Sequence, residues 1–144
     1  MLEAGDGLAL AGPSPVGKHV LFLEALNDET VANQACEALA TNYGASQLKL
    51  SKLSVPTRIV KLPEVAAPYT APTVRALVQL DPASHVMFTQ QHGQQAYQPP
   101  FPPFLKRPQP VEVDNPIEVV HTLAVSFADS YRLAGTPTVS DPTQ

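Results

Sequence analysis

The clearest pattern of apolar and polar positions lies in residues 114–135, DNPIEVVHTLAVSFADSYRLAG. At 100° per residue, one half of the helical wheel collects apolar and aromatic side chains: Ile117, Val119, Val120, Leu123, Ala124, Phe127, Ala128 and Tyr131. The other half is polar, with Val125 set among polar neighbours. This apolar face is about twice as wide as the stripe of an ordinary surface helix. It predicts a helix that packs on its own sheet and on a further surface.

The sequence also predicts where this helix begins and ends. Asn115 can act as the N-cap, Pro116 can occupy the first helical position, and Glu118 can close a capping box onto Asn115. Gly135 can supply a left-handed stop, and Pro137 follows it.

The first half of the chain predicts a strand and then a helix. Residues 19–26, HVLFLEAL, favour a buried strand, and a short helix is the alternative because the run is not β-branched. Asn27 and Asp28 offer caps for a helix that ends at Gly44. Its apolar positions recur at helical spacing: Val31, Ala35, Leu39 and Tyr43.

Further apolar runs, separated by prolines and turn residues, predict the remaining strands. We expect strands at 46–55, 57–62, 73–80 and 85–89, and a loop or sheet edge at 63–72. Packing two helices on one such layer predicts an α+β fold, with a small mixed or antiparallel sheet of about four or five strands and both helices on one face. Extended Pro-rich arms complete the predicted fold.

The same pattern predicts the domain organisation. Residues 1–18 form an extended N-terminal arm, residues 19–135 a single α+β domain, and residues 136–144 an extended tail. The domain contains a Pro-rich linker at 99–110, PPFPPFLKRPQP, with six prolines in twelve residues. Proline fixes φ and removes a donor, so this linker is expected to be extended polyproline II.

The linker carries Phe101, Phe104 and Leu105, which have no local element to bury them. A preformed polyproline strand loses little entropy on docking, so these side chains and Val125 are candidate contacts with a neighbouring subunit. The alternative is that the linker crosses its own sheet and covers its own core.

Composition supports a protein with covered surfaces. The chain has 144 residues and 44% hydrophobic residues, which suits one domain with a core. Charged residues make up 15%, against a usual ~25%. Because charge keeps monomers apart in solution, this low fraction favours a surface covered by other subunits, self or hetero, over a bland monomer surface.

Several partners and compartments are disfavoured. The net charge is −4 and the basic residues are scattered, so we expect no nucleic acid partner. No run reaches the ~18 apolar residues of a membrane span. The N-terminus starts acidic and has no basic n-region, so we do not expect secretion through a signal peptide. A virion or the cytoplasm is the expected location.

Residues 12–19, GPSPVGKH, resemble the phosphate-binding loop of P-loop nucleotidases, in the version found in guanylate kinases. The resemblance covers about eight residues and implies nucleotide and Mg²⁺ binding. His19 stands where the family has the Ser or Thr that holds Mg²⁺, and Pro13 and Pro15 remove two backbone donors. These departures favour a Gly-Pro arm over a nucleotide site.

The titratable residues do not form a recognisable catalytic or metal-binding pattern. The four histidines lack the spacing of a zinc site: His19, His85, His92 and His121. The lone Cys36 is typical of small core filling, and residues 81–84 predict a turn before His85. We therefore expect no catalytic, cofactor-binding or metal-ligating residues, no cofactor, and no enzymatic activity.

These observations favour a non-enzymatic structural subunit of a larger assembly that docks neighbours through its Pro-rich arms. By elimination, a virion or phage component, such as a capsid-decorating or head–tail protein, is the expected context. Two alternatives remain open: a small α/β ligand- or nucleotide-binding domain using residues 12–19, or an accessory subunit of a large cellular complex.

Overall fold

A computed structural model describes residues 17–26, 28, 30–31, 33–50, 62–95 and 111–144. Several expectations lie outside these residues: most of the arm at 1–18, the strand at 57–61, and the linker at 99–110 with Phe101, Phe104 and Leu105.

The described strands form two sheets. The main sheet is parallel, in the order β1 (Val20–Ala25), β4 (Arg75–Leu80), β2 (Ser46–Lys49) and β3 (Glu64–Ala66). The second sheet is an antiparallel pair, β5 (His92–Gln95) and β6 (Val111–Asp114). Residues 85–89, expected to be a strand, form turns instead, while the polar stretch at 92–95 forms β5.

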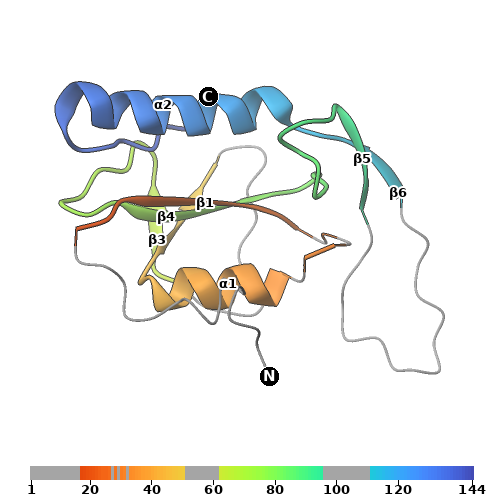
Figure 1. Cartoon of the computed structure of the whole chain (residues 1–144), viewed down its shortest axis with the longest axis horizontal. Helices are drawn as coiled ribbons and strands as arrows, with labels where there is room; N and C mark the ends of the chain where they lie inside the picture. Colours follow the sequence, from red (N-terminus) through yellow and green to blue (C-terminus); the bar gives the residue numbers. More distant parts are fainter. Residues whose placement is uncertain (1–16, 27, 29, 32, 51–61, 96–110) are drawn as a thin grey trace.

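The two helices cover opposite faces of the main sheet. In Figure 1, α2 (Ile117–Ala134) lies above the sheet and α1 (Asn33–Asn42) lies below it. The predicted class, a small α+β fold, is confirmed. The expectation of a mixed or antiparallel sheet with both helices on one face is wrong. The inner strand β4 is buried from Ala76 to Leu80, so both of its faces need a cover.

Strand alternation divides the core between these faces. On the α2 side, Val120 and Leu123 of the helix pack with Val78 and Leu80 of β4. On the α1 side the cluster is smaller and includes Ala40, Ala45, Leu62 and Leu77. The α1 side is therefore the less apolar of the two, which leaves room for buried polar groups.

The end of α2 is as predicted, and its beginning is not. Gly135 adopts φ 73° and donates its N–H to Tyr131 O, which confirms the left-handed stop. The helix begins at Ile117, and Pro116 precedes it without a side-chain cap, so the predicted Asn115 cap and capping box are wrong.

Asn115 instead forms hydrogen bonds with the loop that follows β4. Its Oδ1 accepts a hydrogen bond from Ser84 N at 2.7 Å, and its Nδ2 donates to Gln90 O at 2.9 Å. Because these two hydrogen bonds engage both ends of the Asn115 amide, the side chain does not cap the helix.

Residues 136–144 lie against the loop between β3 and β4. Val139 is fully buried and exchanges two backbone hydrogen bonds with Tyr69, at 2.8 and 3.0 Å. Ser130 of α2 accepts a further bond from Thr138 N at 2.9 Å.

Candidate functional site

Two features of the main sheet are candidates for function: a polar pocket at the carboxyl ends of its strands, and the outer edge of β1. In parallel sheets, ligands bind at the carboxyl ends of the strands. Here a pocket of about 220 Å³ lies beside the ends of β1 and β4. Its polar lining is Glu24, Asp28, Asn33, Cys36 and His85.

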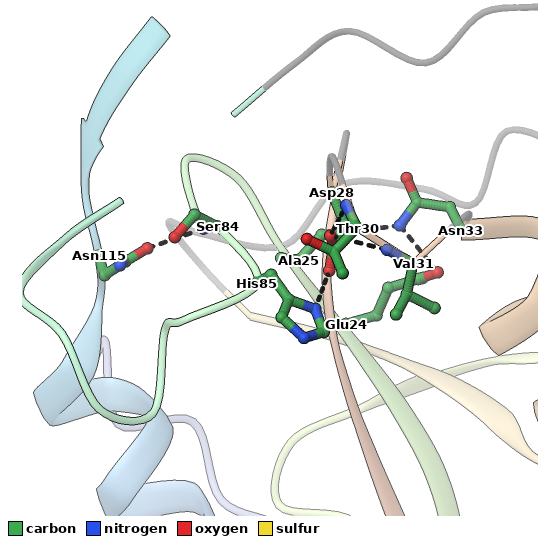
Figure 2. A network of polar contacts seen from close by, with 9 residues as sticks. All are labelled: Glu24, Ala25, Asp28, Thr30, Val31, Asn33, Ser84, His85 and Asn115. Carbon is green, nitrogen blue, oxygen red and sulfur yellow. Dashed lines mark hydrogen bonds and ion pairs between the residues drawn. The ribbon is translucent and has the colours of Figure 1, made fainter. Parts of the chain in front are cut away.

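Asp28 and His85 meet across the ends of the two adjacent strands. His85 Nδ1 lies 2.9 Å from Asp28 Oδ2. Figure 2 shows this contact as a dashed line within the polar network. The carboxylate is itself fixed, because its Oδ1 accepts backbone hydrogen bonds from Thr30 at 2.7 Å and Val31 at 3.0 Å. In the tautomer that donates Nδ1–H to Asp28, His85 Nε2 is a proton acceptor.

Glu24 lies deeper, at 2% exposure. Its carboxylate accepts hydrogen bonds from Asn33 Nδ2 at 3.0 Å and from Gln79 Nε2 at 2.7 Å. The pKa of Glu24 is raised to about 7, chiefly by burial; the hydrogen bonds from Gln79 and Asn33 lower it, and the nearby charges of Glu37 and Asp28 add to the rise. This carboxyl group therefore exchanges its proton near neutral pH.

Glu24 begins a row of buried polar side chains that crosses three strands under α1. Gln79 of β4 also donates to Glu37 Oε1 of the helix at 3.3 Å. Gln47 of β2 donates to Gln79 Oε1 at 2.9 Å. All four side chains are at most 2% exposed. Because buried polar groups are costly unless hydrogen-bonded, this row fixes how α1 sits on the sheet.

Cys36 lines the same pocket but is not activated. Burial raises the pKa of its thiol to about 11, and the carboxylates of Glu24, Asp28 and Glu37 add to the shift. The thiol is therefore protonated at neutral pH and is a poor nucleophile. Across the described parts of the chain, no group of three or more His, Cys, Asp or Glu residues is arranged to hold a metal ion.

Sequence reasoning missed this pocket. The turn expected at 81–84 is displaced: residues 81–82 form a bend, and the hydrogen-bonded turn begins at Ser84, whose carbonyl accepts from Met87 N at 3.0 Å. His85 pairs with Asp28, and Ser84 N with Asn115. The one available signal was Glu24, an acid placed inside an otherwise apolar strand. Its partners come from segments distant in sequence, so no local spacing reveals them.

The second candidate feature is the outer edge of β1. Val20 N donates to Val74 O, just before β4, and Leu26 N donates to Leu80 O of β4, each at 2.9 Å. Because hydrogen-bonding directions alternate along a strand, the N–H and C=O groups of Leu21 and Leu23 point away from β4. Within the described ranges, no strand pairs with β1 on that side.

The two edges of the sheet differ in how they are protected. The edge strand β3 has three residues, lies between Pro63 and Pro68, and carries the Glu64–Lys49 ion pair at 2.7 Å. Such short, charged and proline-flanked edges resist pairing with another chain. The edge of β1 begins with four apolar residues, Val20–Leu23, and Glu24 follows them with its side chain buried. Among the described strands, β1 therefore forms the less protected edge.

An apolar groove of about 420 Å³ lies beside this edge, on the α2 side. Leu21 and Leu23 line it from the strand, Ala124 and Phe127 from the helix, and Phe88 from the loop after β4. Phe88 is 42% exposed. The groove and the outward backbone groups of Leu21 and Leu23 lie side by side, an arrangement suited to an extended chain.

The other expected site residues fall as follows. Val125, the predicted partner contact on α2, is 59% exposed. Of the stretch that resembles a phosphate-binding loop, residues 17–19 are described, and they lead into β1. A phosphate-binding loop follows a strand and opens a helix, so this context differs from that of the family. His19 Nδ1 accepts a hydrogen bond from Val74 N at 3.1 Å.

Comparison with protein-family models, with curated proteins and with solved structures finds no match to this chain. Neither of the two helices within the described residues is long and apolar enough to cross a membrane.

Proposed function

We propose that this protein is a structural subunit of a larger protein assembly and that it joins its neighbours through the open edge of β1. One observation carries the proposal: β1 presents outward backbone groups at Leu21 and Leu23, within its apolar stretch Val20–Leu23. An edge of this kind is a template for another strand, and proteins that remain monomeric usually block it.

The surroundings of the edge support the same function. The groove beside β1 offers apolar contacts from Phe88 and Phe127, which would give side-chain affinity in addition to the backbone ladder. Exposed Val125 at 59% and Leu133 at 75% add apolar surface on α2. The low charged fraction of 15% fits a chain whose surface is covered by other subunits.

In its finer form, the proposal places the subunit in a virion or phage particle, as a capsid-decorating or head–tail protein. Its support is compositional: few charges and 16 prolines. An accessory subunit of a large cellular complex has the same support, and purification from infected and uninfected cells would separate the two.

The test uses two proline variants and the mass of the purified protein. Leu21→Pro removes an outward N–H that β4 does not use, so the ladder between β1 and β4 should stay intact. Ala66→Pro is the matched control, because Gln47 N bonds to Pro63 O and alternation points Ala66 N–H away from β2 at the protected edge. By sedimentation, we expect an oligomer for wild type and Ala66→Pro and a smaller species for Leu21→Pro. Equal masses for all three would contradict the proposal.

A second candidate function is favoured by the polar pocket. We propose, as the alternative, a small α/β ligand-binding domain in which His85 and Glu24 exchange protons with the ligand. A fragment library screened by NMR tests it: ligands should shift His85 ring signals and leave those of the exposed His92 unchanged. ATP with Mg²⁺ serves as the probe for residues 12–19. No shift with any probe would count against this candidate.

A further inference from the structure

We propose that the strand that pairs with β1 is β1 of a second copy of this chain, in an antiparallel ladder centred on Phe22. Two four-stranded sheets would then join into one continuous sheet of eight strands around a two-fold axis. This inference rests on the proposed function and names the partner at that edge.

The backbone of β1 is self-complementary about Phe22. With Phe22 opposite Phe22 of the second copy, Leu21 lies opposite Leu23 and Leu23 opposite Leu21. These are the residues whose N–H and C=O groups point away from β4. Both pairs therefore exchange two hydrogen bonds, while the Phe22 pair occupies the non-hydrogen-bonded position between them. Four hydrogen bonds form and no strand residue within this ladder faces a mismatched group.

The side chains match in the same register. Leu21 and Leu23 project to the α2 side, where they line the groove with Phe88 and Phe127. In the dimer, the same leucines of the second copy would lie beside them and extend one apolar surface across the axis. Phe22 projects to the α1 side, next to Tyr43 at a ring separation of 5.6 Å. Its aromatic ring would therefore meet the second Phe22 ring.

Charge also favours antiparallel pairing. Exposed Lys18 precedes β1, and Asp28 follows its end. In an antiparallel pair, the Lys18 end of one β1 lies beside the Asp28 end of the other, so opposite charges meet at both ends of the ladder. A parallel arrangement would place like charges together and would leave the assembly without a closing two-fold axis.

Disulfide trapping in the full chain tests the register. With Cys36→Ala as background, Phe22→Cys should form a disulfide-linked dimer under mild oxidation, because opposed residues at a non-hydrogen-bonded pair have Cα atoms about 4.5 Å apart. Leu21→Cys is the control. It lies opposite position 23, so the two Leu21 Cα atoms stand beyond the ~7 Å limit for a disulfide. Leu21→Cys combined with Leu23→Cys should link again.

The outcomes separate this inference from the function on which it rests. Cross-linking of Phe22→Cys and of the double variant, but not of Leu21→Cys alone, supports the two-fold ladder. If Leu21→Pro still reduces the mass of the assembly but Phe22→Cys does not cross-link, the β1 edge stands as an interface and this register is overturned. A wild-type protein that sediments as a monomer at all concentrations overturns both.

Discussion

At the residue scale, Glu24 is the group with the most specific physical consequence. It is a carboxyl group whose ordinary pKa of 4.5 is raised to about 7, chiefly by burial. The folded protein therefore keeps this proton in a range where the unfolded chain releases it. Between pH 4.5 and 7 the folded state binds more protons, so the free energy of unfolding falls as pH rises. Outside this window, Glu24 contributes no slope.

We expect wild-type protein to lose about 3 kcal/mol of stability across this window, since one pKa unit corresponds to about 1.36 kcal/mol. Glu24→Gln cannot ionise and should lack this slope. Urea unfolding from pH 4 to 8 measures it, with the exposed Glu118→Gln as control. A slope that persists in Glu24→Gln would show that the carboxyl group is not held protonated by the fold.

At the element scale, Asn115 links the loop after β4 to the chain before α2. Asn115→Ala should leave Ser84 N–H and Gln90 C=O without their partner and cost about 1–3 kcal/mol. Asn115→Asp retains an acceptor for Ser84 and should cost less. Chemical denaturation gives the free energy, and far-UV circular dichroism gives helix content. A loss of helix content in folded Asn115→Ala would show that Asn115 does cap α2, and it would contradict the role in the loop described above.

A second prediction at this scale concerns Gly135, the residue that ends α2. Its φ of 73° is left-handed, and a Cβ there would meet no atom within 4 Å, so Gly135→Ala introduces backbone strain alone. We expect a loss of about 1–2 kcal/mol. Asn tolerates this conformation better, so Gly135→Asn should lose less. Equal melting temperatures for all three proteins would contradict the left-handed stop.

These elements also show what local patterns can and cannot reveal. The wide apolar face of 114–135 is enough to predict α2, and Gly135 is enough to predict its end. The apolar run at 19–26 favours the strand that forms there but leaves a short helix as an alternative. The strand at 92–95 is polar and is specified by its pairing with 111–114. Propensity cannot detect such a strand, because its stability comes from a distant partner.

The arrangement of the elements in space was harder to predict from the sequence than the elements themselves. β4 is an inner strand that is buried on both faces, so each face of the sheet needs a helix to cover it. The polar row from Glu24 through Gln79 to Gln47 joins three strands, so each member looks ordinary in its own segment. The pocket likewise depends on Asp28 meeting His85.

At the scale of the whole molecule, the two edges of the main sheet differ in how they are protected. The edge of β3 is short and carries charge, while the edge of β1 is apolar from Val20 to Leu23 and has outward donors at Leu21 and Leu23. Assembly through β1 would satisfy these donors and cover the groove beside Phe88 and Phe127 in one step.

Amide hydrogen exchange, read residue by residue at increasing protein concentration, tests this account most directly. The amides of Val20 and Leu26 already bond to β4 and should be protected in every sample. The amides of Leu21 and Leu23 should become protected as concentration rises and the edge fills, and Leu21→Pro should abolish the change at Leu23. Rapid exchange at Leu21 and Leu23 at every concentration would contradict assembly through β1.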